Sequence, residues 1–434
     1  MSLAGSPGGD AFVLLGFPDL QGQVRGKALR PAAFESALAD GATMTDLLLA
    51  LDPADAPIDS YTGFGIRAGA GDLQVHPEPE TLRALSWRPG WKVCLVTPSW
   101  ADGRPCSLAP REVLRRVLAR TDALGYEVRS AFEYEVRLTD REGEPVSTGI
   151  SYSVGEISRI DSFLAVLRPA LDVLGIELSA VHTEAGPGLI ELNLAPASGL
   201  AAADAATYLK LAVKEVAAEL GMSANFMAKP VAGEEGSSGH IHISWWKDGA
   251  NAFAVGAEEG LPGALAASAL AGMLGHLPAA SLVLNPTINS YKRLVPGWFA
   301  PVNCSWGVEN RSAALRAIFP PEHPGRCRVE CRRPGADANP YLALAVLVAA
   351  AADGVESGAV LPAPVSGDAA IDDELPGLPA SLEEALIRWS EDSRLAELLG
   401  EEFAAYYATS RHWELTAWQQ AVSSWELERY ARAV

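Results

Sequence analysis

Arg328-Val329-Glu330-Cys331-Arg332 is the stretch around which we expect the chain to fold. In an extended strand, successive side chains point to opposite faces, so Arg328, Glu330 and Arg332 share one face while Val329 and Cys331 share the other. One face of this predicted strand is therefore charged, and the other is apolar.

Three further segments show the same alternation: Phe132-Glu133-Tyr134-Glu135-Val136, Leu189-Ile190-Glu191-Leu192-Asn193-Leu194 and Gly239-His240-Ile241-His242-Ile243-Ser244. On one reading, all four are amphipathic strands of an ordinary antiparallel sheet whose polar face is solvated. However, carboxylates two residues apart on a strand repel each other unless a cation lies between them. We therefore predict a site for polyvalent metal ions with arginines beside it.

The composition sets limits on the class of protein. A chain of 434 residues predicts two domains, and a formal net charge of -20 argues against a nucleic acid partner, because a phosphate backbone binds basic surfaces. The first ten residues have neither a basic segment nor an apolar segment, and the longest apolar run, near 342–352, is too short to span a bilayer. We expect a cytoplasmic protein with no membrane segment.

The cysteines also favour the cytoplasm. Their odd number and the absence of a CxxC pair suit buried thiols in a reducing compartment better than disulfides. His323, Cys327 and Cys331 form an alternative zinc site that lacks a fourth spaced ligand. The cysteines are Cys94, Cys106, Cys304, Cys327 and Cys331.

Local patterns divide the chain into a β-rich domain at 1–104 and a larger domain at 105–434. In the first domain we predict a hairpin at 11–30 and strands at 71–75 and 93–97. In the second, Gly and Pro signals and apolar periodicity predict helices and strands in alternation. The predicted helices are 110–124, 157–174, 200–220, 262–277, 339–354 and, with interruptions, 381–430, and the predicted strands are 127–138, 176–195 and 239–244.

The charged strands supply a large set of candidate metal ligands: Glu133, Glu135, Glu184, Glu191, His240 and Glu330. So many oxygen ligands suit two hard divalent ions, Mg²⁺ or Mn²⁺, better than one zinc ion. Two ions suggest phosphoryl transfer, in which guanidinium groups neutralise charge on the transferred group. The arginines nearby in the sequence are Arg311, Arg316, Arg328 and Arg332.

Longer motifs in this order and spacing resemble the glutamine synthetase family. They are FEYEV at 132–136, HTEAGPGLIELN at 182–193, NFMAKP at 225–230, GSSGHIHIS at 236–244, NPTINSYKRLVPG at 285–297, NRSAALR at 310–316 and RVECRRPGADANPYL at 328–342. The resemblance implies an α+β fold, with an N-terminal β-grasp domain and a catalytic domain whose curved antiparallel sheet is flanked by helices. It also implies a homo-oligomer, a dodecamer of two stacked hexamers with sites between neighbours.

The resemblance implies roles for matching residues. Glu135, Glu184 and Glu191 would hold one ion, and Glu133, His240 and Glu330 a second, with two or three Mg²⁺ or Mn²⁺ ions in all. ATP would contact His242, Ser244 and Arg328, and L-glutamate would contact Arg293, Gly236 and Arg332. Arg311, Arg316 and Arg328 would be catalytic and face the phosphates. The implied reaction activates the γ-carboxylate of glutamate with ATP and then transfers it to an amine.

The chain departs from the family at the acceptor side. Ammonia-using members have a glutamate in the lid segment where this chain has Phe299, and an aspartate from the neighbouring subunit where this chain has Thr62 or a neighbour of it. Because ammonium is held by charge, we expect Phe299 to line a site for an organic amine such as ethanolamine, an alkylamine or a polyamine. The alternatives are an ordinary glutamine synthetase, a non-catalytic scaffold and a metallohydrolase built on His240 and His242.

Overall fold

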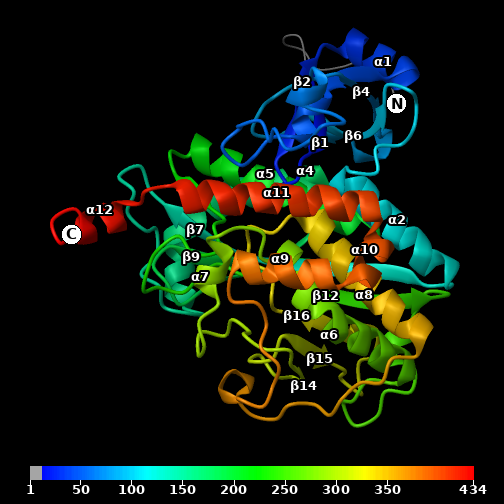
Figure 1. Ribbon diagram of the computed structural model, residues 1–434, viewed down its shortest axis with the longest axis vertical. Helices are drawn as coiled ribbons and strands as arrows, with labels where there is room; N and C mark the ends of the chain where they lie inside the picture. Colours follow the sequence, from blue (N-terminus) through cyan, green and yellow to red (C-terminus); the bar gives the residue numbers. More distant parts are fainter. Residues whose placement is uncertain (1–11) are drawn as a thin grey trace.

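The computed structural model describes residues 12–434, and its N-terminal part contains a six-stranded sheet, blue to cyan at the top of Figure 1. The strand order is β2-β1-β6-β4-β3, with β5 paired to β6. β1 and β2 pair antiparallel, which confirms the predicted hairpin from residue 12 onward; residue 11 lies outside the described residues. The strands are β1 (Val13–Pro18), β2 (Val24–Leu29), β3 (Ala42–Thr45), β4 (Asp72–Pro77), β5 (Arg83–Ala84) and β6 (Lys92–Trp100).

A ten-stranded sheet forms the centre of the larger part, in the order β14-β15-β16-β12-β7-β9-β8. All pairs along this path are antiparallel except β14 with β15, which differs from the fully antiparallel sheet that we predicted. The strands are β7 (Glu127–Thr139), β8 (Leu178–Thr183), β9 (Leu189–Leu194), β10 (Ala197–Ser198), β11 (Ser223–Asn225), β12 (Gly239–Lys247), β13 (Ala250–Asn251), β14 (Trp306–Val308), β15 (Leu315–Ile318) and β16 (Arg328–Cys331).

The helices match the predicted segments with shifted ends. In the segment predicted as a helix at 157–174, the long helix begins only at Asp161. The interruptions predicted within 381–430 are confirmed, because this segment forms four helices. The helices are α1 (Pro31–Asp40), α2 (Pro110–Ala123), α3 (Val154–Ile157), α4 (Asp161–Leu174), α5 (Leu200–Glu219), α6 (Ala264–Leu284), α7 (Ser290–Arg293), α8 (Pro340–Ser357), α9 (Leu382–Glu391), α10 (Ser393–Leu399), α11 (Glu401–Gln420) and α12 (Ser424–Tyr430).

α6 and α8 are the most apolar helices, and both are long and apolar enough to cross a membrane by length and composition. From the sequence, we had judged the apolar run near 342–352, which lies in α8, to be too short to span a bilayer. Both helices are largely inside the protein, and they approach each other closely at Gly272 and Gly354. A Cβ at Gly272 would lie 2.2 Å from the Ala350 carbonyl oxygen, so this crossing requires glycine. Packing against each other in the core accounts for their apolar composition.

The predicted division between residues 104 and 105 falls in the connection from β6 to α2, between the two sheets. Contacts nevertheless join the two parts. The Tyr208 hydroxyl donates to the Thr81 carbonyl at 2.9 Å, and the Arg83 Nε donates to the Leu174 carbonyl at 2.8 Å. The two-domain boundary therefore stays a prediction.

His276 of α6 joins three helices through an ionic network. Its Nδ1 lies 2.6 Å from Asp392 Oδ2, its Nε2 lies 3.1 Å from Asp353 Oδ2, and Arg394 also contacts Asp353. Burial would lower the pKa of His276, but the hydrogen bonds to the two aspartates raise it above its ordinary value. The charged imidazole therefore stabilises the packing of α6 against α8 and α10.

We expect His276→Ala to lower the free energy of unfolding by about 1–3 kcal/mol at acidic to neutral pH, because two charge-assisted hydrogen bonds are lost. Since the folded pKa is raised, the stabilisation is complete below the unfolded pKa of about 6.5 and disappears as the pH rises through the folded pKa. Urea unfolding across this pH range measures the difference. Replacing the exposed His412 of α11 is the control, and an equal pH dependence in both variants would contradict the assignment.

Candidate active site

The charged side chains of the central sheet lie on one face because of the strand register. His240 of β12 is opposite Glu133 of β7, and His242 is opposite Glu330 of β16. The other face carries apolar side chains that are buried in the core. The charged face is not solvated either, since Glu330 is only 1% exposed and His240 is 5% exposed. An ordinary sheet with a solvated polar face is therefore the wrong interpretation.

Glu133, His240 and Glu330 form one compact cluster, as the sequence predicted. One ligand atom from each lies within 4.8 Å of the others, and His240 Nδ1 is 3.5 Å from Glu330 Oε1 and 3.8 Å from Glu133 Oε2. His240 Nε2 is buried and has no hydrogen-bond partner among the described residues. Burial alone would raise the pKa of Glu330, but nearby His242 and Arg332 lower it to about 2. These carboxylates are therefore charged and able to bind a cation.

A second cluster differs in one member from the predicted set. His182, Glu184 and Glu191 offer ligand atoms within 4.8 Å of one another, with His182 Nε2 at 2.8 Å from Glu184 Oε1 and 3.6 Å from Glu191 Oε1. Glu135 was expected in this set, but its Oε2 accepts a hydrogen bond of 2.7 Å from the Ser238 backbone N–H. His182 was not among the predicted metal ligands. It belongs to the cluster because β8 pairs with β9 and sets His182 opposite Glu191.

Electrostatic repulsion is concentrated at Glu191. Burial raises its pKa to about 8, and the neighbouring carboxylates Glu135 and Glu133 add to the rise. Such a rise is typical of carboxylates that share a site without a cation between them. The donor set therefore fits a divalent ion.

Arginines surround the first cluster. Arg316 Nη1 lies 3.0 Å from Glu330 Oε2, Arg332 also pairs with Glu330, and Arg328 Nε lies 3.1 Å from His242 Nδ1. The predicted glutamate-binding Arg332 therefore contacts a protein carboxylate in this structure. Guanidinium groups in this position can neutralise the charge of phosphate oxygens.

Arg293 lies at the end of α7 and is fully buried. Its Nη1 and Nη2 donate to the backbone carbonyls of Arg333 and Arg332 at 3.1 and 3.3 Å. Burial lowers its pKa to about 10, so it remains charged at neutral pH. A buried cation held only by neutral carbonyl groups is suited to bind an anionic substrate group.

One cavity of about 750 Å³ joins these groups, and we call it the active-site cavity. Ser244 is the one predicted site residue that does not line it. The predicted residues that line it are Glu133, Glu135, Glu184, Glu191, Gly236, His240, His242, Arg293, Phe299, Arg311, Arg316, Arg328, Glu330 and Arg332.

Ser244 lines a second, adjoining cavity of about 450 Å³. This cavity shares Glu133, His242 and Arg328 with the active-site cavity, so all three predicted ATP contacts lie along it. Its wall includes Trp246, whose ring lies 4.0 Å below the Arg129 guanidinium carbon. The position of Trp246 on the cavity wall gives an aromatic surface suited to a nucleotide base.

The segment after α7 adds two aromatic rings, those of Trp298 and Phe299, to the lining of the active-site cavity. Phe299 is 63% exposed and has a φ of 51°, an unusual conformation for a residue with a Cβ. The neighbouring Trp298 ring lies 3.9 Å from Lys229 Nζ, within cation–π range. The segment therefore presents Phe299 to the cavity while Trp298 is anchored.

Two further cavity residues were missed from the sequence, Tyr152 and Glu235. Tyr152 has a φ of 55° and stacks on His182, with ring centroids 4.1 Å apart. Burial and the nearby carboxylates Glu135 and Glu184 raise the pKa of Glu235. Glu235 could have been noticed beside the predicted Gly236, whereas nothing local marked Tyr152. The cavity therefore contains one carboxylate, that of Glu235, beyond those predicted as metal ligands.

The alternative zinc site is not assembled. Among residues 12–434, the groups of ligand atoms close enough to hold an ion are the two clusters described above, and His323, Cys327 and Cys331 belong to neither. All five cysteines have free thiols; Cys304 is partly buried and the other four are buried.

Comparison with known proteins identifies the family. Residues 107–430 match the model of the glutamine synthetase catalytic domain. A γ-glutamylethanolamide synthetase of Streptomyces coelicolor is 36% identical, covering 96% of this chain and 92% of its own length. A glutamate–isopropylamine ligase of a Pseudomonas species is 34% identical, covering 96% and 94%. Proteins named glutamine synthetase match at 32–34% identity.

A solved structure of a complex between GmaS and ADP has the same fold. Its TM-score is 0.86 at 30% identity, and the match covers 98% of this chain and 97% of that chain. Because the matching family consists of ligases, the metallohydrolase alternative is wrong. The chain belongs to the glutamine synthetase family of ATP-dependent carbon–nitrogen ligases.

Proposed function

We propose that this enzyme joins the γ-carboxylate of L-glutamate to an organic amine through a γ-glutamyl phosphate intermediate. The observation that carries the proposal is the lining of the active-site cavity, which includes the rings of Phe299 and Tyr152 as well as the carboxylate of Glu235. The names of two similar proteins, which describe ligases for ethanolamine and isopropylamine, support the same reading.

Two groups of ligands would hold divalent ions, and the orphaned His240 Nε2 and the raised pKa of Glu191 support this fit. One group is Glu133, His240 and Glu330. The other is His182, Glu184 and Glu191, with Glu135 opposite Glu191 on the neighbouring strand. Bound Mg²⁺ or Mn²⁺ ions would neutralise phosphate oxygens of ATP.

The chain's own residues would position two substrates along the cavities. His242, Ser244 and Arg328 would contact ATP, whose base would lie against the Trp246 wall. Arg293, Gly236 and Arg332 would hold the charged groups of glutamate. Arg311, Arg316 and Arg328 would bind the transferred phosphoryl group as its negative charge spreads over the equatorial oxygens.

In the first step, a γ-carboxylate oxygen of glutamate attacks the γ-phosphorus of ATP, and the bond to ADP breaks. In the second, the amine nitrogen attacks the acyl carbon, inorganic phosphate leaves with the former carboxylate oxygen, and the nitrogen loses a proton. The first step replaces a poor leaving group, oxide, with phosphate. Glu235 can accept a hydrogen bond from the protonated amine before it reacts.

The acceptor side distinguishes an organic amine from ammonium. The carbon atoms of an organic ammonium ion can pack against the Phe299 and Tyr152 rings, which favours binding. Its charge can be balanced by the carboxylate of Glu235. Ammonium has no carbon to bury and relies on charge and hydrogen bonds alone. Glu235 is also the observation that keeps ordinary glutamine synthesis as the second candidate function.

An amine screen tests the proposal. With ATP, Mg²⁺ and saturating glutamate, we expect phosphate release with the best small organic amine to exceed that with ammonium at least about tenfold in kcat/KM, which corresponds to about 1.4 kcal/mol. Ethanolamine, isopropylamine and simple alkylamines form the first set. Equal rates with ammonium and with every amine would reject the proposal in favour of a glutamine synthetase. A scaffold without catalysis would release no glutamate-dependent phosphate and bind no Mn²⁺ in calorimetry.

We also propose that the chain assembles into a homo-oligomer, as the family resemblance implies, with a dodecamer as the expected form. Exposed aromatic side chains at the C-terminal end support an assembly surface, namely Trp418, Trp425 and Tyr430. In Figure 1, α12 projects away from the rest of the chain. A purified chain that sediments as a monomer would contradict this. The expected cytoplasmic location stays a prediction.

A further inference from the structure

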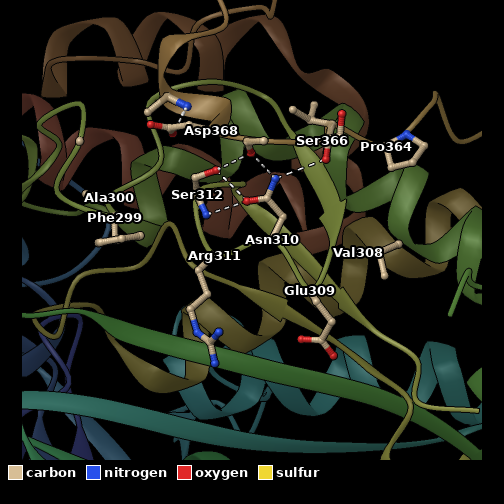
Figure 2. A pocket seen from close by; sticks show the side chains of 14 residues that line it. Phe299, Ala300, Val308, Glu309, Asn310, Arg311, Ser312, Pro364, Ser366 and Asp368 are labelled. Carbon is tan, nitrogen blue, oxygen red and sulfur yellow. Dashed lines mark hydrogen bonds between the residues drawn. The ribbon is translucent and has the colours of Figure 1, made fainter. Parts of the chain in front are cut away.

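A third cavity opens beside the active-site cavity, and we call it the rim cavity. It has a volume of about 660 Å³ and is formed by the segments around 297–300, 308–312 and 364–370 (Figure 2). Two of its lining residues, Phe299 and Arg311, also line the active-site cavity. The two cavities therefore share one aromatic ring and one guanidinium as a common wall.

The rim cavity is held together by hydrogen bonds between its segments. Asn310 Nδ2 donates to the Gly367 carbonyl at 2.8 Å and to the Val365 carbonyl at 3.3 Å. The Ala369 backbone N–H donates to Ser312 Oγ at 2.8 Å. The two Asn310 bonds, drawn in Figure 2, and the Ser312 bond tie the connection between β14 and β15 to the segment that follows α8. The two segments are therefore held together along the rim cavity.

The charges around the rim cavity are unevenly arranged. Its acids are Glu309 and Asp368 and its base is Arg311, and Figure 2 shows Asp368 and Arg311 on opposite sides. Glu309 is paired with Arg316, which does not line this cavity. Asp368 Oδ1 accepts from the Ala370 backbone N–H at 2.9 Å, which leaves lone pairs of the carboxylate available. Once Arg311 faces phosphate groups, the remaining charge of the rim cavity is negative.

Apolar side chains lie between these charged groups. Phe299, Ala300, Val308 and Pro364 all line the rim cavity. The lining of the rim cavity therefore combines carbon surface with the carboxylate of Asp368.

We infer that the rim cavity holds the distal end of the acceptor amine and that its carboxylates favour an acceptor with a second ammonium group, a diamine or polyamine. This inference rests on the proposed function, because the reacting amino group occupies the active-site cavity. Phe299 contacts the methylene chain, and Asp368 binds the distal ammonium. The volume of about 660 Å³ leaves room for an acceptor larger than ethanolamine.

Two matched series of acceptors test the inference. Propylamine, butylamine and pentylamine are compared with the corresponding α,ω-diamines, using glutamate-dependent phosphate release. We expect the best diamine to exceed its monoamine at least about tenfold in kcat/KM, and Asp368→Asn to reduce this ratio about threefold to tenfold, as for loss of a partly exposed charge contact. Asparagine retains an oxygen that can accept the Ala370 hydrogen bond, so the local turn is preserved.

Two further variants complete the experiment. Asp373 is an exposed residue near Asp368 in the chain that does not line the rim cavity. Asp373→Asn removes a negative charge there and should leave the ratio of diamine to monoamine use unchanged. Ser366→Lys adds a cation to the rim and should lower the ratio further. This inference would be overturned, and the proposed function would stand, in either of two outcomes. One is equal use of monoamines and diamines; the other is a ratio that does not change in Asp368→Asn and Ser366→Lys. If no organic amine exceeds ammonium, the proposed function fails and this inference fails with it.

Discussion

Glu330→Gln should lower glutamate-dependent phosphate release by about 10²–10³-fold, because Glu330 contributes to the cation cluster and also orients two arginines. Its carboxylate lies 3.5 Å from His240 and 3.0 Å from Arg316, and it pairs with Arg332. An amide in its place offers no negative charge to a divalent ion. Calorimetry should therefore show weaker binding at one of the Mn²⁺ sites as well as slower catalysis.

The same substitution should also affect stability. Glu330 is 1% exposed, so replacing its carboxylate with a neutral amide leaves Arg316 and Arg332 without a buried counter-ion. Breaking a buried ion pair typically costs about 3–5 kcal/mol, which urea unfolding would measure. Glu322→Gln, an exposed position in the same part of the chain, is the control for both measurements. Full activity and unchanged Mn²⁺ binding in a folded Glu330→Gln protein would rule out the proposed metal site.

Phe299→Glu should shift acceptor use toward ammonium, with kcat/KM for ammonium rising about tenfold and that for organic amines falling by a similar factor. A charge contact at about 4 Å is worth about 4 kcal/mol at an intermediate effective dielectric, but the 63% exposure of Phe299 screens much of it, so we expect about 1–2 kcal/mol. The organic amine loses its aromatic contact at the same time.

Phe299→Leu separates the two contributions. It removes the aromatic ring without adding charge, so it should weaken organic amine use while leaving ammonium use low. Steady-state rates with ammonium and with the best organic amine for the three proteins give the comparison. If Phe299→Glu and Phe299→Leu both retain the original acceptor preference, Phe299 is a structural part of the lid and not an acceptor wall.

The sequence predicted the central strands well because their chemistry repeats every second residue. The alternation around Glu133, His240 and Glu330 requires an extended backbone with one charged face, and the structure confirms it. Longer helices were found from Gly and Pro signals, but their ends shifted by several residues. α1 and β3 were missed because their short, mixed sequences carry no strong period.

The site was predicted from motifs, and the convergence of these residues on one cavity is confirmed. Their roles in binding metal, ATP and glutamate stay predictions. His182 was not expected in the second cluster, because it lies in a strand whose register with β9 cannot be read from its neighbours. Tyr152 and Glu235 reach the cavity from connecting segments. No local pattern marked Tyr152, whereas Glu235 lies beside the predicted Gly236.

By itself, the sequence determined which residue types share a strand face, because side-chain direction follows from the local backbone period. It also determined the family, since the motifs span nearly the whole chain. Only the tertiary structure decided that the charged face is buried, that His182 joins the second cluster, and that a rim cavity adjoins the acceptor side. These properties depend on strand register and on the packing of segments far apart in the chain, which no local pattern specifies.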